Sequence, residues 1–97
     1  MQLAKVLGQV VSTIKGPGLE RFTLLLVQEA DSDDPERDGG AVFVAVDTVG
    51  AGVGEIVLVC TGGAARVAAG PEVPTDRAVV GIADTVVRVG SVTYQKT

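Results

Sequence analysis

The 97-residue sequence contains no histidine and no tryptophan, one cysteine, two phenylalanines and one tyrosine. Histidine is the commonest general acid–base group near neutral pH, so its absence counts against an enzyme. The single cysteine, Cys60, excludes a disulfide within the chain, and without histidine it cannot build a structural zinc site. We therefore predict no catalytic residues, no metal site and no cofactor, with Cys60 as a buried apolar thiol.

Long apolar runs are also missing. No run approaches the roughly 20 residues that a membrane span needs, and residues 1–6 lack the basic and apolar blocks of a signal peptide. A lone cysteine fits a reducing compartment. We expect a cytoplasmic protein without a membrane partner.

Positive charge is scarce, and the net charge is −4. Clustered acids, with Arg37 as the one base among them, fall within residues 31–38: Asp31, Asp33, Asp34, Glu36 and Asp38. An EF-hand needs Asp or Asn and then Gly where this chain has Pro35 and Glu36, so calcium binding is excluded. Residues 30–40 are predicted to be a solvated loop.

Glycine and valine are abundant, and residues 44–59 place three glycines between two β-type apolar runs. Gly50, Gly52 and Gly54 allow either a phosphate-binding turn or a close approach of two backbones. A phosphate site needs a helix after the glycines, whereas residues 56–59 (Ile-Val-Leu-Val) indicate a strand and Glu55 repels anions. The tight turn is the better interpretation.

Hydrophobic patterning predicts mostly strands. Strands are expected at residues 3–14, 19–29, 41–47, 55–61, 78–89 and 91–95, with a bend at Gly8 and a break near Asp84. In the second strand, Phe22, Leu24 and Leu26 alternate against Arg21 and Thr23. Alanines followed by Gly70 and Pro71 predict a short helix at residues 62–69. The expected fold is all-β with one short helix, as a single domain (residues 1–97) forming a small five-stranded OB-like β-barrel.

Two Asp-Thr pairs, Asp47-Thr48 and Asp84-Thr85, follow predicted strands. Paired carboxylates can act as acid and base. Such residues more often close a strand end by accepting bonds from nearby backbone N–H groups, which is the interpretation that we prefer.

The chain resembles the EutN/CcmL family of bacterial microcompartment vertex proteins from residue 1 to about residue 84. The opening residues 3–15 and residues 24–28 look like the family's first two strands, and residues 44–59 match its signature V-A-V-D-x-V-G-A-G-x-G-E-x-V-L-V. The family commonly has Gly-Ser-Ser-Ala-Arg where this chain has Gly-Gly-Ala-Ala-Arg at residues 62–66, which leaves Thr61 as the nearest candidate for a helix cap.

The resemblance implies a non-enzymatic shell protein that forms homopentamers, caps the five-fold vertices of a carboxysome-like shell and meets hexameric shell proteins. A ring pairs two different faces of each subunit. The residues expected at the subunit interface or ring axis are Asp47, Gly50, Ala51, Gly52, Gly54, Glu55, Gly62, Gly63, Ala64, Ala65 and Arg66. Glu55 and Arg66 are the charged groups expected to bond across the junction.

Two other function classes stay open at this stage. An OB-like barrel can be a binding module for nucleic acid or a small molecule, although nucleic-acid surfaces use basic grooves and aromatic platforms that this chain lacks. An enzyme relying on carboxylates is the other alternative, and the absence of histidine weighs against it.

Overall fold

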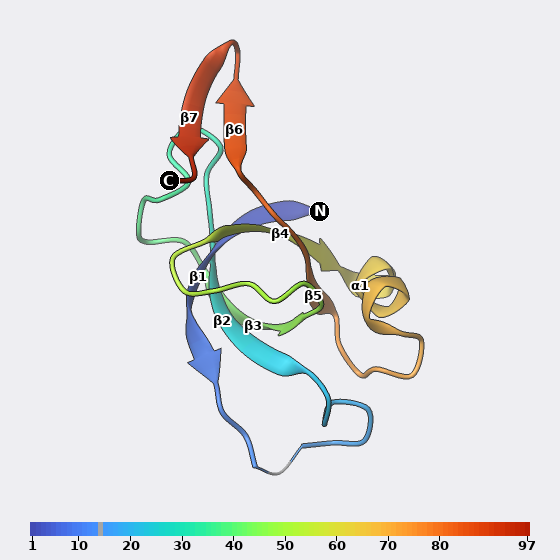
Figure 1. The fold of residues 1–97 in the computed structure, drawn as a ribbon. Coiled ribbons are helices and arrows are strands. Elements are labelled where there is room, and N and C mark those ends of the chain that lie inside the picture. The colour runs from blue at the N-terminus through green and yellow to red at the C-terminus, as the bar shows by residue number, and fades with distance from the viewer. Residues whose placement is uncertain (14) are drawn as a thin grey trace.

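A computed structural model describes residues 1–13 and 15–97, which form seven strands and one helix (Figure 1). In chain order they are β1 Gln2–Val10, β2 Thr23–Glu29, β3 Val42–Asp47, β4 Ile56–Thr61, α1 Gly62–Ala69, β5 Arg77–Ile82, β6 Thr85–Arg88 and β7 Ser91–Gln95. Five strands close a barrel in the order β1-β2-β3-β5-β4, and β6 and β7 form a separate hairpin. The predicted five-stranded barrel with one short helix is confirmed.

The barrel is antiparallel except where β3 meets β5. Those two strands run parallel, with Val46 opposite Ala78 and Asp47 opposite Val79. Parallel neighbours need a crossover connection, and here β4 and α1 provide it. The barrel closes where β1 pairs with β4.

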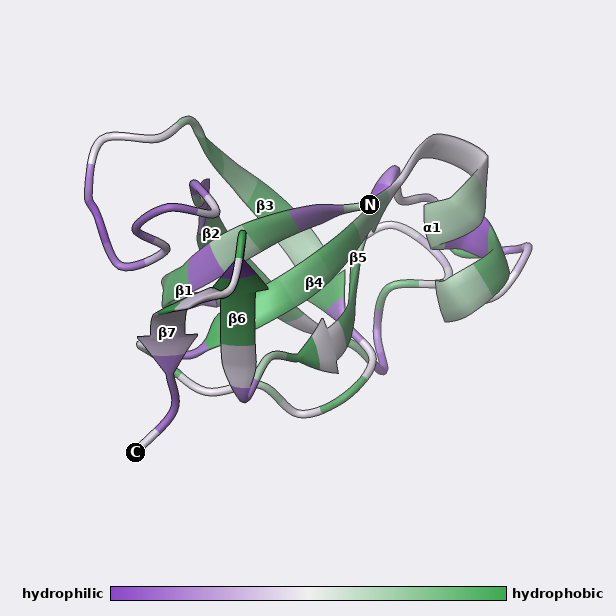
Figure 2. Cartoon of the chain, turned by 90° about the horizontal axis from the view of Figure 1, so that it is seen from above, coloured by the Kyte–Doolittle hydropathy of each residue, from purple (hydrophilic) through white to green (hydrophobic). Residues whose placement is uncertain are grey.

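The barrel interior is filled by small aliphatic side chains. Its buried members are Ala4, Val6, Leu25, Val27, Ala45, Val57, Val59 and Val79. Interior space shrinks as strand number falls, so a five-stranded barrel has room for valine and alanine rather than for large rings. This explains why the chain needs so few aromatic residues. Figure 2 shows the hydrophobic residues concentrated along the barrel strands.

A second buried cluster lies where α1 covers the outside of the barrel. Ala65 and Ala69 on α1 pack with Val46 on β3 and Cys60 on β4. Cys60 is buried, as predicted. A helix of eight residues is marginal by itself, so this packing rather than propensity holds it in place.

The ends of α1 differ from the prediction at one position. Thr61 occupies the N-cap position but makes no side-chain cap bond, so its predicted capping role is wrong. The N–H of Gly62 instead donates to the carbonyl of Asp76 at 2.8 Å. At the other end the backbone turns at Gly70, with φ of +124°, as predicted.

The first two predicted strands are too long. β1 ends at Val10 rather than at residue 14, a position that lies outside the described residues. β2 begins at Thr23 rather than at residue 19, because the N–H of Phe22 donates to the carbonyl of Leu19 at 3.1 Å and makes a turn there. The predicted bend at Gly8 is confirmed by a register shift between Val6 and Gly8.

The alternating residues predicted in β2 do not face the barrel interior. Leu25 and Val27 point into the barrel, whereas Phe22 and Leu24 pack against the outer cluster. Strands covered on both faces carry continuous apolar runs, so alternation cannot identify the inner face. The predicted break near Asp84 is confirmed, since β5 ends at Ile82 and β6 begins at Thr85.

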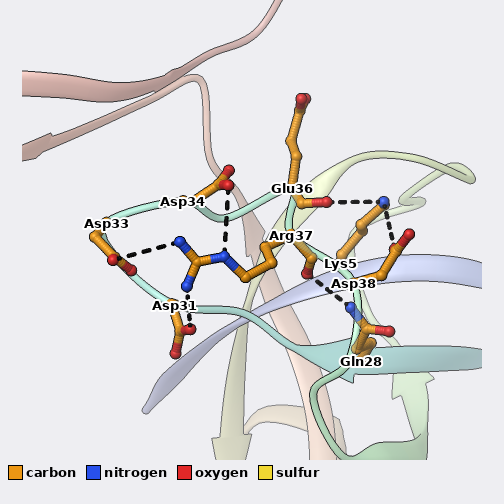
Figure 3. Close-up of polar contacts among 8 residues, drawn as sticks. All are labelled: Lys5, Gln28, Asp31, Asp33, Asp34, Glu36, Arg37 and Asp38. Atoms are coloured by element: carbon orange, nitrogen blue, oxygen red, sulfur yellow. Dashed lines mark hydrogen bonds and ion pairs between the residues drawn. The ribbon is translucent and has the colours of Figure 1, made fainter.

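The acidic loop, residues 30–40, is organised around one guanidinium (Figure 3). Arg37 lies 3.5 Å from Asp31 and 3.7 Å from both Asp33 and Asp34. The three carboxylates remain about half exposed or more, as expected of a solvated loop. Pro35, however, is fully buried.

The loop is also anchored to the barrel through its backbone. Buried Gln28 on β2 donates to the carbonyl of Arg37 at 3.0 Å, and Lys5 on β1 donates to the carbonyl of Glu36 at 3.2 Å. At Gly40 a Cβ would overlap the carbonyl of Glu29, so only glycine allows this approach. The loop is therefore solvated in its side chains and fixed in its backbone.

Candidate subunit interface

The glycine loop, residues 47–55, joins β3 to β4 and begins with a carboxylate clamp. The Asp47 carboxylate accepts bonds of 2.9–3.0 Å from three backbone N–H groups, those of Val49, Gly50 and Ala51. The prediction that this residue closes the strand end is confirmed. Asp47 and half-buried Ala51, which packs against the barrel interior, thus have roles within the subunit.

A second carboxylate closes the loop. Glu55 accepts a bond from the N–H of Gly52 and another from the ammonium of Lys96, both at 2.6 Å. The bond from Lys96 and then the bond from Gly52 lower the pKa of Glu55, and the Glu55 carboxylate raises the pKa of Lys96. The N–H of Gly54 donates to the carbonyl of Val6 at 2.8 Å and holds the loop against β1.

The three glycines of the loop are not required for the same structural reason. Gly50 and Gly54 have φ of +81° and +88°, a region that favours glycine. Gly52 has no positive φ, and a Cβ there would lie 3.4 Å from the carboxylate oxygen of Glu55, which is a tolerable contact. The subunit by itself therefore explains two of these glycines but not Gly52.

The start of α1 presents a surface of very small residues. Gly62, Gly63 and Ala64 are exposed, and a Cβ on Gly63 would meet nothing within 4 Å. Ala65 is fully buried against the barrel, so its side chain serves the subunit's own core. Its place at the subunit interface or ring axis stays a prediction.

The two charged groups expected to bond across a junction already have partners within the subunit. Exposed Arg66 donates to the carbonyl of Pro71 at 2.9 Å, and Glu55 binds Lys96. Sequence reasoning missed Lys96 because its partner is distant along the chain and no local motif links the two. Glu55 precedes β4 and Arg66 follows it in α1, so the strand, about 20 Å long, separates them.

Sequence reasoning also missed exposed valines on the outside of the barrel. Val42 and Val44 on β3 are 53% and 45% exposed. The signal was present, because Val42, Val44 and Val46 alternate along the strand and share its outer face. Within residues 1–13 and 15–97 no three acidic, histidine or cysteine side chains gather to hold a metal, and no helix has the length and apolarity to cross a membrane.

The sequence is similar to a known protein family and to several of its members. The family model described as ethanolamine utilisation protein EutN/carboxysome matches residues 1–84. The bacterial microcompartment shell vertex protein PduN of Salmonella typhimurium is 52% identical over 88 residues, which cover 88% of this chain and 97% of PduN. The carboxysome shell vertex protein CcmL of Synechocystis sp. is 53% identical over 87 residues, which cover 89% of this chain and 85% of CcmL.

A solved structure extends the likeness to three dimensions. GrpN of Rhodospirillum rubrum, a pentameric microcompartment shell protein, superposes with a TM-score of 0.82 at 47% identity, covering 92% of this chain and all of GrpN. The closed barrel and these relatives define the class as microcompartment shell vertex proteins. Within that class, the chain belongs to the EutN/CcmL family.

Proposed function

We propose that this chain is a non-enzymatic subunit of a closed homopentamer that caps the five-fold vertices of a bacterial microcompartment shell. The observation that carries the proposal is the likeness to pentameric GrpN over 92% of this chain. Because the two subunits share a fold and nearly half of their residues, we expect the same kind of contact between neighbouring subunits.

Glycines that the subunit itself does not need support a contact at the glycine loop and at the start of α1. Gly52 and Gly63 have neither a positive φ nor a close neighbour that forbids a side chain. Glycine inside a helix costs about 1 kcal/mol relative to alanine, so Gly63 weakens α1 without a local benefit. A neighbouring backbone approaching both positions closely would explain why no side chain is present.

The separation of these two segments suits a ring. A ring contact is heterologous, so one face of a subunit meets a different face of the next. Glu55 precedes β4 and α1 follows it, so the glycine loop and the start of α1 adjoin opposite ends of this strand. Exposed Arg66 retains N–H groups beyond the one that binds Pro71, and we propose that these bond across the junction.

The proposed partners beyond the ring are hexameric shell proteins, which would surround each pentamer in the shell. A nucleic-acid partner is disfavoured by charge, because the chain carries 12 acidic residues against 8 basic ones. The proposed location is the shell of a microcompartment.

Native mass spectrometry tests the ring directly. We expect a single species with the mass of five chains of 9.8 kDa each, and no additional mass from a bound molecule. Stable contacts of this kind bury on the order of 1,000 Å² or more, so the ring should persist at micromolar concentration. A monomer or dimer under these conditions would refute the proposal.

A further inference from the structure

The β6–β7 hairpin projects from the barrel (Figure 1), and its two faces differ in exposure. On one face Tyr94 is buried and Val86, opposite Tyr94, is half-buried. On the other face Val87 and Val92 are paired, and they are 62% and 59% exposed. The face with Val87 and Val92 is therefore apolar and uncovered.

The tip of the hairpin carries a strained valine. Val89 and Gly90 have φ of +50° and +79°, which is the pattern of a type I′ turn. The first central position of such a turn favours asparagine, whereas a β-branched residue with positive φ is an outlier. Val89 is 97% exposed, so no contact within the subunit explains its presence.

The β7 side of the hairpin and the residue that follows it are fixed to the two loops described above. The hydroxyl of Thr93 donates to the carbonyl of Ser32 in the acidic loop at 2.5 Å. The N–H of Lys96 donates to the carbonyl of Asp84 at 2.7 Å, and its ammonium binds Glu55 of the glycine loop. The hairpin is thus held in one direction and is continuous with the proposed interface.

The hairpin also differs from the rest of the chain in charge. Residues 85–97 contain Arg88 and Lys96 but no acidic residue, so this segment carries +2. The remaining residues hold 6 bases and 12 acids, which gives −6. Lys96 is paired with Glu55, whereas Arg88 forms no ion pair with any described residue. The exposed basic tip is thus opposite in charge to the rest of the chain.

We infer that the β6–β7 hairpin is an arm that packs on a second copy of this chain, against the outer face of its β3. This inference rests on the proposed ring and names one of its contacts. The receiving surface is Val42 and Val44, and Val44 borders a hollow of about 200 Å³ together with Leu19, Leu24 and Pro74.

Two features favour a second copy as the occupant. The arm and the outer face of β3 are different apolar surfaces of one subunit, and a heterologous contact pairs different surfaces. A two-stranded hairpin has bare edges and is marginally stable in isolation, so it gains from being covered. A ring in which each arm reaches the next subunit covers every arm and every β3 face.

The test uses the full chain and two substitutions that keep the local structure. Val89→Asn suits the type I′ turn better than valine does, and Val44→Thr keeps the β-branched shape while adding a hydroxyl. Val11→Asn is the matched control, because Val11 is 82% exposed and belongs to neither surface. Sedimentation equilibrium measures pentamer dissociation. Fluorescence of Tyr94, the only tyrosine in a chain without tryptophan, reports whether the hairpin stays packed.

We expect Val89→Asn and Val44→Thr each to raise the chain concentration at half-dissociation by about tenfold or more, with unchanged tyrosine fluorescence. The double variant should lose little more pentamer stability than the weaker of the two single variants, because both substitutions disrupt the same contact. Val11→Asn should match the unmodified chain.

Other outcomes overturn the inference. If the Val89→Asn pentamer dissociated at the same concentration as the unmodified one, the hairpin would not be a contact of the ring. This would hold even if the variant no longer bound hexameric shell proteins. If the two substitutions lowered pentamer stability by strictly additive amounts, the outer face of β3 would not be the surface that receives the hairpin. If the unmodified chain itself formed no pentamer, the proposed function would fail first.

Discussion

Gly52 and Gly63 are the glycines of the proposed interface whose identity the subunit does not explain. Neither position has a positive φ, and neither has a neighbour close enough to forbid a methyl group. Gly16 shares both properties in an exposed turn away from these surfaces, which makes it a matched control.

Alanine at each position separates subunit effects from ring effects. We expect Gly63→Ala to stabilise the monomer by about 0.5–1 kcal/mol through helix propensity and yet to weaken the pentamer. Gly52→Ala should leave the monomer nearly unchanged and also weaken the pentamer, whereas Gly16→Ala should affect neither. Denaturation below the dissociation concentration and sedimentation above it measure the two quantities. A stronger pentamer with Gly63→Ala would exclude α1 from the contact.

The Glu55–Lys96 pair makes the attachment of the hairpin pH-dependent. The pKa of Glu55 is lowered from 4.5, so the stability that it contributes is complete above pH 4.5 and is lost as pH falls below that value. The pKa of Lys96 is raised from 10.5, so its contribution is complete below pH 10.5 and is lost as pH rises further.

Lys96→Met should therefore lower stability by a constant amount between pH 4.5 and 10.5, with a shrinking difference outside that window. Lys96→Arg should keep the acid-side loss but remove the alkaline one, because the guanidinium stays charged. Thermal melts across pH check both variants. A flat difference through pH 3 would mean that the pair contributes nothing.

Among the elements, the acidic loop departs most from its prediction. Its carboxylates are solvated, yet Pro35 is fully buried and the side-chain amide of Gln28 donates to the carbonyl of Arg37. Exposed ion pairs contribute little, whereas a buried amide left without its acceptor is costly. The anchoring therefore resides in the backbone rather than in the charges.

Replacing residues 32–38 with a short Gly-Ser linker should keep the barrel but lower its stability by roughly 2 kcal/mol, because Gln28 loses its acceptor. The double variant Asp33→Asn, Asp34→Asn should cost less than about 1 kcal/mol, since both carboxylates are half exposed. Urea denaturation with circular dichroism measures both. Equal losses would show that the charges, not the backbone bonds, anchor the loop.

At the scale of the whole molecule, the chain is elongated around a small core. Its extents are 44 × 23 × 22 Å, and the hairpin projects beyond the barrel along one end. Small domains bury a modest share of their surface, and a barrel filled with alanine and valine gains less than one filled with large side chains. Burial between subunits would supplement that core, which links the stability of the barrel to the ring.

The sequence determined the elements with strong local signals. Alanines followed by Gly70 and Pro71 defined α1, and the glycines flanked by apolar runs defined the turn after β3. The signature at residues 44–59 and the matching segments before it pointed to the family whose model matches residues 1–84. These features depend on neighbouring residues, so a linear reading finds them.

Only the tertiary structure decided which face of β2 is inside and which charges pair. The apolar run in β2 is covered on both sides, and the partner of Glu55 arrives from the end of the chain as Lys96. It also placed Ala65 in the subunit core. Each of these depends on segments that are distant in sequence and adjacent in space, and no local pattern encodes that adjacency.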